Sequence, residues 1–135
     1  MVDIVSKSKR SQMMASVRHK DTKPELTVRS FLHKHGFRFR LHRKDLPGQP
    51  DIVFPKYRHV IFVHGCFWHQ HPGCSKAKRP NTNCEFWNKK LDANIQRDRT
   101  NFQALIKAGW TISTVWECDL DNQQLNALLK EIVRK

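Results

Sequence analysis

The sequence lacks any long run of apolar residues: the longest, "VIFV" at 60–63, has only four. A helix that crosses a membrane needs about 20 such residues, so we expect none in this chain. The N-terminal "MVDIVSKSKR" also lacks the apolar core of a secretory signal, which predicts a protein that stays in the cytoplasm. No internal repeat is visible.

Acidic residues are scarce as well. The chain has 12 Asp and Glu against 25 Lys and Arg, which gives a formal charge of +13 on 135 residues. So strong a positive field favours polyanions, nucleic acid before an anionic membrane surface. Because 39% of the residues are apolar, the composition is that of a globular protein. We expect a basic N-terminal arm over residues 1–20 and a single domain over residues 21–135. Phosphate contacts are expected from Lys7, Lys9, Arg10 and Arg18.

The first half of the chain predicts a helix followed by three strands. Thr22 and Glu25 have the spacing of a capping box, Pro24 suits a first helical turn, and Gly36 is well placed to end the helix. Residues 37–46 alternate apolar and basic side chains as a half-exposed strand does, with Phe37, Phe39 and Leu41 facing inward. The segments "DIVF" and "HVIFVH" read as two strands joined by the short loop "PKYR".

The second half predicts a long helix, a strand and a closing helix. Residues 85–108 form a helix that ends at Gly109, and "WTISTVWE" is a strand. The long helix has an apolar stripe of Trp87, Leu91, Ile95, Phe102, Leu105 and Ile106. The closing helix buries Leu125, Leu128, Leu129 and Ile132. The order α-β-β-β-α-β-α predicts an α/β fold with a mixed sheet flanked by helices.

Closely spaced cysteines and histidines form a candidate metal site. Cysteines of a protein that is not exported stay reduced, which favours metal binding over disulfides. Cys66, His71 and Cys74 lie within nine residues, and structural zinc usually has four ligands. The candidates for the fourth are Cys118, Cys84, His64 and His69.

Topology favours Cys118 as the fourth zinc ligand. The strands that end just before Cys66 and Cys118 are joined through the long helix, so they should be parallel, with their C-terminal ends at one edge of the sheet. Cys84 is then a loop or helix-end residue. Because protein side chains would fill all four positions, this zinc has a structural role.

Two aspartates outside the zinc ligands also stand out. Pairing Phe54 with His59 places Asp51 opposite Phe62, so Asp51 and His64 share a face at one end of the hairpin. A carboxylate beside an imidazole suits a hard metal ion and proton transfer, although Asp51 alone reads as an ordinary residue that starts a strand. Asp98 lies on the apolar stripe, where its partner is either an arginine or lysine or a histidine of the Cys/His loop.

Several motifs resemble the very-short-patch repair (Vsr-type) DNA mismatch endonucleases. In order, they are "LPGQPDIVF", "VIFVHGCFWHQH", "EFW", "QRD" and "GWTISTVWEC", and the likeness covers roughly residues 10–120. The resemblance implies the fold of type II restriction endonucleases, whose common core has the order α-β-β-β-α-β. It also implies magnesium-dependent nicking of one DNA strand, 5′ of the thymine in a T·G mismatch, which arises when 5-methylcytosine deaminates.

The resemblance also assigns roles to residues of this chain. Asp51 would bind Mg²⁺, His64 and His69 would handle the attacking water and the scissile phosphate, and Asp98 would support a histidine. Glu25 would join this site, although helix capping is the simpler interpretation. Phe67, Trp68 and Trp87 would form an aromatic wedge inserted beside the mismatch. Structural zinc would be held by Cys66, His71, Cys74 and Cys118. The expected partner is duplex DNA with a T·G mismatch, together with mismatch-repair proteins, for a monomer in the bacterial cytoplasm.

Two positions depart from related patterns. Restriction enzymes have a second acid and a lysine where Phe62 and His64 stand, an exchange that the resembled family shares, so main-chain oxygen, water and phosphate must complete the magnesium shell. The family usually has Thr where this chain has Val63, whose main-chain carbonyl remains available as a ligand. Two other interpretations stay open: a zinc-stabilised nucleic-acid-binding module without catalysis, and a restriction-type nuclease that cuts paired DNA.

Overall fold

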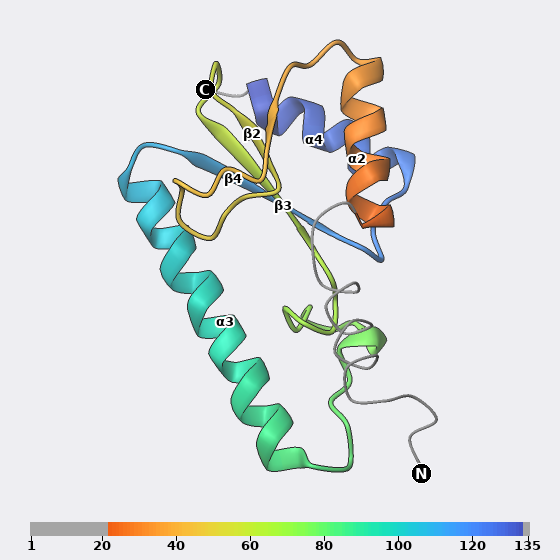
Figure 1. The fold of residues 1–135 in the computed structure, drawn as a ribbon. Coiled ribbons are helices and arrows are strands. Elements are labelled where there is room, and N and C mark those ends of the chain that lie inside the picture. The colour runs from red at the N-terminus through yellow and green to blue at the C-terminus, as the bar shows by residue number, and fades with distance from the viewer. Residues whose placement is uncertain (1–21, 134–135) are drawn as a thin grey trace, which may run out of the picture.

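The computed structural model describes residues 22–133, which form a mixed sheet flanked by helices (Figure 1). The predicted basic arm at residues 1–20, with Lys7, Lys9, Arg10 and Arg18, lies outside the described residues. Within residues 22–133, no helix is both long and apolar enough to cross a membrane.

The elements follow the predicted order. They are α2 (Lys23–Lys34), β1 (Arg40–Leu41), β2 (Ile52–Phe54), β3 (His59–His64), the short 3₁₀ helix η1 (Ser75–Ala77), α3 (Cys84–Lys107), β4 (Thr111–Trp116) and α4 (Asn122–Val133). The sheet order is β1-β2-β3-β4, with β1–β2 and β2–β3 antiparallel and β3–β4 parallel. The mixed sheet and the predicted pairing of Phe54 with His59 are therefore confirmed. The likeness of this core to restriction endonucleases stays a prediction.

The two faces of the sheet carry separate halves of the core. Alternate residues of a strand point to opposite faces, so Ile61 packs with α2 and α4, whereas Val60 and Phe62 pack toward α3. Figure 1 shows α2 and α4 together on one side of the strands and α3 on the other. Because β3 is covered on both faces, five of its six residues are buried. This central strand gives the site at its C-terminal end a rigid support.

Helix α2 begins as its sequence predicts. The Thr22 hydroxyl accepts a hydrogen bond from the Glu25 N–H at 3.4 Å, and Pro24 lies in the first turn. Val28 and Leu32 are fully buried against the sheet. The chain turns at Gly36, whose φ of +80° lies in the left-handed region that glycine adopts at no steric cost.

Two details of the predicted packing are wrong. Strand β1 covers only Arg40–Leu41, and Leu41 is 39% exposed rather than inward, because the chain leaves the extended region at His42 with a φ of +47°. Phe37 and Phe39 do pack on the core, although they lie before the strand. Ile106 is 63% exposed, since it lies about 100° around the helix from Leu105, which faces the sheet.

Candidate active site and metal centre

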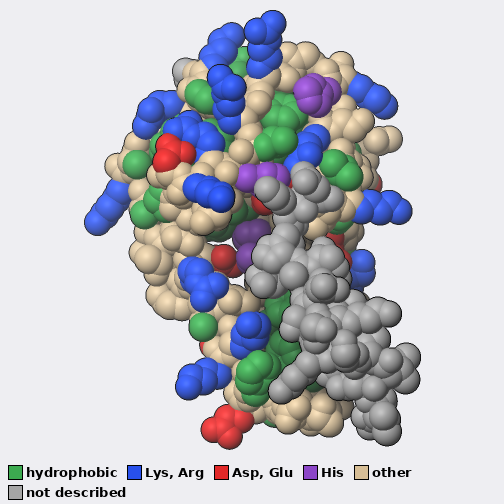
Figure 2. Space-filling model, in the orientation of Figure 1, with side chains coloured by type: hydrophobic (Ala, Val, Ile, Leu, Met, Phe, Trp, Pro, Cys, Tyr) green, Lys and Arg blue, Asp and Glu red, His purple; other side chains and the backbone are tan. Residues whose placement is uncertain are grey.

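A cleft of about 1410 Å³ opens at the C-terminal end of β3, between α2 and α3. Its lining includes all the residues that the sequence suggested for catalysis, together with Val63, the suggested magnesium ligand: Glu25, Asp51, Val63, His64, His69 and Asp98. Lys44, Lys90 and Arg97 also line it. Figure 2 shows histidine and acidic side chains recessed near the middle of this face, with lysine and arginine side chains around them. A cationic rim around such a recess suits a phosphate group.

The loop 46–50 is pressed tightly against the cleft wall. Gly48 has a φ of +76°, and a Cβ at this position would lie 3.1 Å from the Asn101 Cβ of α3 and 3.2 Å from the Phe62 ring. Only glycine combines this positive φ with so close an approach to α3 and Phe62 without a shift of the loop. The "PGQP" turn therefore fixes the direction in which the chain enters β2, directly after Asp51.

His69 and Asp98 form a hydrogen-bonded pair in the cleft. The distance from His69 Nδ1 to Asp98 Oδ2 is 2.6 Å. When Nδ1 donates to the carboxylate, the other ring nitrogen, Nε2, is left to accept a proton, and the carboxylate stabilises the imidazolium that results. Of the two partners that the sequence left open for Asp98, the structure therefore places the histidine of the Cys/His loop beside it.

His64 stacks directly on His69. Their ring centroids are 3.6 Å apart and their planes differ by 3°. His64 is only 4% exposed, and burial, followed by the proximity of His69, lowers its pKa to about 3. Its Nδ1 atom is buried without a hydrogen-bond partner among the described residues. A buried polar atom of this kind marks a place where a water or substrate oxygen is needed.

Asp51 lies in the same cleft but in a neighbouring cluster. Its Oδ2 atom accepts a hydrogen bond from the Val63 N–H at 2.7 Å, which brings the Val63 peptide next to the carboxylate. Burial raises the pKa of Asp51 to about 6, and the Glu25 charge adds to the rise, while the Val63 N–H opposes it. A buried carboxylate with so high a pKa binds a proton or a cation readily, which fits a hard-metal ligand.

Glu25 and His42 complete the cluster around Asp51. The Glu25 carboxylate is 1% exposed and lies 2.7 Å from His42 Nε2, and it also accepts a hydrogen bond from Arg29. The ligand atoms of Glu25, His42 and Asp51 all lie within 4.8 Å of one another. Glu25 thus contributes both to the helix start and to the cleft. The sequence interpretation missed His42, because its position depends on the left-handed backbone that ends β1.

The four predicted zinc ligands come together at the edge of the sheet. Their ligand atoms lie within 4.8 Å of one another, and three of the separations are 3.6 Å (Cys66–His71), 3.3 Å (His71–Cys118) and 3.9 Å (Cys74–Cys118). Zn–S and Zn–N bonds of about 2.3 and 2.0 Å give tetrahedral ligand separations of roughly 3.5–3.8 Å. All four cysteines of the chain are free thiols, so no disulfide competes with a metal ion.

The parallel pairing of β3 with β4 creates this group. His64 pairs with Trp116, so Cys66 and Cys118 follow the two strands at the same edge. Cys84 is exposed at the start of α3, with its Sγ 3.1 Å from the Asn81 carbonyl, and takes no part. Burial raises the pKa of Cys66 to about 12, so a metal ion that binds there must displace its proton.

The aromatic residues that follow Cys66 form an exposed cluster with α3. The ring centroids of Phe67 and Trp68 are 5.1 Å apart, and those of Phe67 and Trp87 are 5.5 Å apart. All three rings are half-buried, so Trp87 belongs to this cluster rather than to the sheet core. Phe86, which the sequence interpretation did not single out, contacts Trp87 and is 61% exposed. A large aromatic surface beside a cationic cleft is well suited to stacking on nucleic-acid bases.

Comparisons with known proteins agree on one family. Residues 2–76 match the family model described as "DNA mismatch endonuclease Vsr". The chain is 50% identical over 134 residues to the type II nicking enzyme V.XorIIP of Xanthomonas oryzae, with 98% of each chain covered. It is 45% identical to the type II nicking enzyme V.NmeAIP of Neisseria meningitidis, covering 98% of this chain and 97% of the relative. It is also 42% identical to the DNA mismatch endonuclease Vsr of Escherichia coli, covering 92% of this chain and 79% of the relative.

Proposed function

The chain belongs to the Vsr family of DNA endonucleases, and from this premise we propose that it nicks one strand of duplex DNA 5′ of the thymine in a T·G mismatch. The proposed reaction is Mg²⁺-dependent hydrolysis of a phosphodiester bond, which starts very short patch repair of deaminated 5-methylcytosine. The relatives support the reaction class, since their names describe nicking enzymes and a mismatch endonuclease.

The observation that carries the proposal is the presence of two complementary clusters in one cleft. Asp51, buried beside Val63 and Glu25, offers a carboxylate for Mg²⁺. The His69–Asp98 pair offers a proton acceptor with a stabilised imidazolium form. A zinc-stabilised binding module without catalysis has no need of either cluster.

The residues of the cleft divide the chemistry as follows. His69 accepts a proton from the attacking water, and Asp98 holds its ring in the reactive tautomer. As the water oxygen bonds to phosphorus, the bond to the leaving 3′ oxygen breaks, and that oxygen takes a proton from solvent water. His64 keeps the His69 ring plane fixed by stacking.

Magnesium fits the donor set around Asp51. Asp51 and the main-chain carbonyl of Val63 would hold the ion, with Glu25 and His42 beside them, and oxygen donors of this kind suit Mg²⁺. A bound Mg²⁺ would supply positive charge that stabilises the negative charge developing on the phosphate oxygens. Zn²⁺ is assigned to the other group, Cys66, His71, Cys74 and Cys118, where all positions are filled by protein and the ion has a structural role.

DNA binding is assigned to the aromatic cluster and to the cations. Phe67, Trp68 and Trp87 insert beside the mismatch, where unstacking costs least. Lys44, Lys90 and Arg97 contact phosphates near the cleft, and the N-terminal Lys7, Lys9, Arg10 and Arg18 extend these contacts. We propose that the protein acts as a monomer in the bacterial cytoplasm, together with mismatch-repair proteins.

A supercoiled plasmid with a single T·G mismatch tests the proposal. With Mg²⁺, the wild-type protein should convert it to the open circular form, and Asp51→Ala should not. The same plasmid without the mismatch should remain supercoiled, whereas its cleavage would support a restriction-type nuclease. Binding of the mismatched plasmid without nicking at any Mg²⁺ concentration would contradict the proposed reaction.

A further inference from the structure

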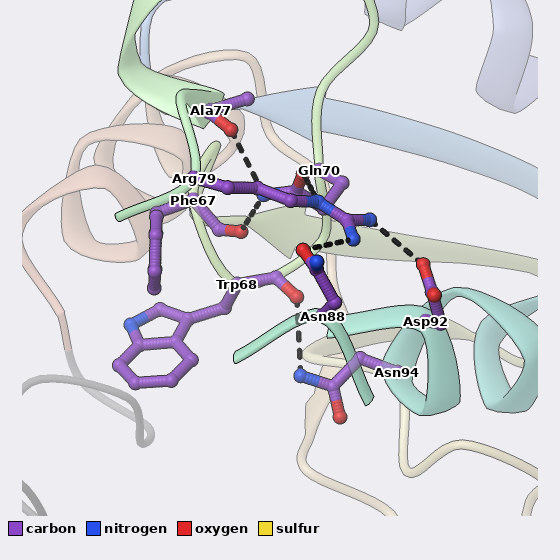
Figure 3. A network of polar contacts seen from close by, with 8 residues as sticks. All are labelled: Phe67, Trp68, Gln70, Ala77, Arg79, Asn88, Asp92 and Asn94. Atoms are coloured by element: carbon purple, nitrogen blue, oxygen red, sulfur yellow. Dashed lines mark hydrogen bonds and ion pairs between the residues drawn. The ribbon is translucent and has the colours of Figure 1, made fainter. Parts of the chain in front are cut away.

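Arg79 joins the Cys/His loop to helix α3 through three different hydrogen bonds. Its Nε donates to Gln70 Oε1 at 2.9 Å, within the loop. Its two terminal nitrogens donate to Asn88 Oδ1 at 2.9 Å and to Asp92 Oδ1 at 2.8 Å, both on α3. Figure 3 shows the guanidinium group between the loop and the helix. Only the planar fork of arginine supplies three donors in this arrangement.

Gln70 links Arg79 to the backbone carbonyl of Phe67, the first of the aromatic residues. Its Nε2 donates to the Phe67 carbonyl at 2.7 Å and to the Ala77 carbonyl at 3.1 Å. Arg79 can donate only to the amide oxygen of Gln70, so this oxygen must face Arg79 and the amide nitrogen must face the two carbonyls. The orientation of the Gln70 amide is therefore fixed. Gln70 has a φ of +50°, which non-glycine residues adopt rarely, and its side-chain bonds add to the backbone hydrogen bond from its own N–H to the Phe67 carbonyl at 3.3 Å.

A second side chain of α3 holds the neighbouring peptide. Asn94 Nδ2 donates to the Trp68 carbonyl at 3.2 Å. The Phe67 carbonyl is therefore held by Gln70 of the loop and the Trp68 carbonyl by Asn94 of α3. Figure 3 shows the aromatic side chains of Phe67 and Trp68 pointing away from the guanidinium. Trp87, the third ring of the cluster, comes from α3 itself.

From this network we propose that Arg79 is a positioning residue. It acts through Gln70 to fix Phe67, and with it the adjoining Trp68, relative to Trp87, so that the aromatic cluster is preorganised to enter the DNA stack. The inference rests on the proposed function, since it assigns a task to a residue that supports the same aromatic cluster. An exposed ion pair between Arg79 and Asp92 alone contributes little. The effect on DNA binding comes from the whole guanidinium group, which bonds both the Cys/His loop and α3. Because these bonds order the aromatic rings in the free protein, less conformational entropy is lost when DNA binds.

The alternative is that Arg79 contacts a DNA phosphate directly, and a charge-reducing variant of its partner separates the two roles. Asp92→Asn removes a negative charge and weakens the hold on Arg79. A phosphate-binding Arg79 would then bind both mismatched and paired DNA more tightly. A positioning Arg79 would instead lose its place, so the preference for mismatched DNA should fall.

The experiment compares Arg79→Met, Asp92→Asn and Arg43→Met by equilibrium binding to mismatched and paired duplexes, with Ca²⁺ in place of Mg²⁺. Arg43→Met is the matched control, because it also removes one arginine from an ion pair, with Asp45, away from the aromatic cluster. Arg79→Met and Asp92→Asn should each lower the mismatch preference about tenfold, as expected for a lost charge-assisted contact. The fluorescence of 2-aminopurine next to the mismatch, which reports unstacking, should fall in parallel, and the double variant should be no worse than Arg79→Met.

Several outcomes would overturn the inference: an unchanged preference in both variants, an equal loss in Arg43→Met, or tighter binding of both duplexes by Asp92→Asn. If the wild-type protein itself shows no mismatch preference, the proposed function fails, and hydrogen exchange of the free protein decides the positioning role. Amides of residues 66–71 should then exchange faster in Arg79→Met and Asp92→Asn but not in Arg43→Met, and equal rates in all proteins would refute it.

Discussion

At the scale of single residues, Asp98 and Asp51 have different tasks although both are aspartates in one cleft. Asp98 is half-buried and paired with His69 at 2.6 Å, so its charge would match the imidazolium of the proposed reaction. Asp51 lies beside Glu25, a like charge, and burial already raises its pKa to about 6. The first environment stabilises a proton on histidine, and the second attracts a cation.

Asp98→Asn should lower the nicking rate about a hundredfold or more, because the amide holds His69 in place without stabilising its charged form. Binding of mismatched DNA should stay close to that of the wild type. Glu85→Gln, a change of the same kind at an exposed position of α3, should leave the rate unchanged. Rates are measured in single turnover with the enzyme in excess. A near-wild-type rate for Asp98→Asn would show that His69 does not depend on this carboxylate.

Replacing His42 should alter the magnesium requirement. His42→Ala removes a hydrogen bond to the buried Glu25 carboxylate, and we expect the Mg²⁺ concentration for half-maximal nicking to rise roughly tenfold, since a charge-assisted bond is lost. His42→Gln retains a donor and should recover most of the affinity. Binding of Mn²⁺, followed by electron paramagnetic resonance, checks the effect without catalysis. Equal metal affinity in both variants and the wild type would mean that His42 has no influence on the cluster.

At the scale of elements, the proposed zinc site depends on two strand ends that lie 52 positions apart in the chain, Cys66 and Cys118. Cys118→Ser should lose stoichiometric zinc and lower the melting temperature, because the loop from 66 to 79 loses its link to β4. Cys84→Ser removes a thiol outside the group and should keep the metal. Zinc is measured by atomic emission after dialysis. Full zinc occupancy in Cys118→Ser would contradict the ligand assignment.

A buried polar network connects β3, β4 and α4. It predicts that the stability of the protein depends on pH. His59 lies 2.7 Å from the Ser113 hydroxyl, which in turn donates to Glu131 of α4. Burial lowers the pKa of His59, so the unfolded chain takes up this proton first as the pH falls below about 6.5. The stability that neutral His59 contributes is present above that pH and is lost as the pH falls through its folded-state pKa.

His59→Gln should therefore be less stable than the wild type at pH 7 but lose stability less steeply on acidification, by up to about 1.4 kcal/mol for each pH unit. Urea unfolding between pH 7.5 and 5 gives both curves. His35→Gln, at the exposed end of α2, should keep the wild-type slope. Parallel curves for His59→Gln and the wild type would rule out a titration of His59 in this range.

The elements themselves followed from sequence patterns, whereas several contacts within the site did not. The edge where Cys66 meets Cys118 was predictable, because a helical crossover makes two strands parallel whatever their side chains. The exposure of Leu41 was not, since a single left-handed residue at position 42 ends the strand. Arg79 lay in a segment interpreted only as a polar loop. A signal was present, because α3 carries Asn88 and Asp92 one turn apart and the segment from Ile52 to Cys84 has no acidic residue to pair with it.

At the scale of the whole molecule, charge and shape act together. The net charge of +13 attracts DNA over long range, and the cations seen around the recess in Figure 2 direct phosphates toward the buried acids. Asp51 and Glu25 would repel the same phosphates unless a cation lies between them, which is the physical reason for the metal requirement that we propose. The proposed function therefore requires that the cleft cut a mismatched strand with the help of a cation at Asp51.

Mapping the cut on a short duplex labelled on both strands, with one T·G mismatch, tests this claim most directly. The wild-type protein with Mg²⁺ should give a single product from the thymine strand, cut on the 5′ side of the thymine, and Asp51→Asn should bind the duplex but leave it intact. Cleavage of both strands, equal cleavage of the paired duplex, or full activity of Asp51→Asn would contradict the account.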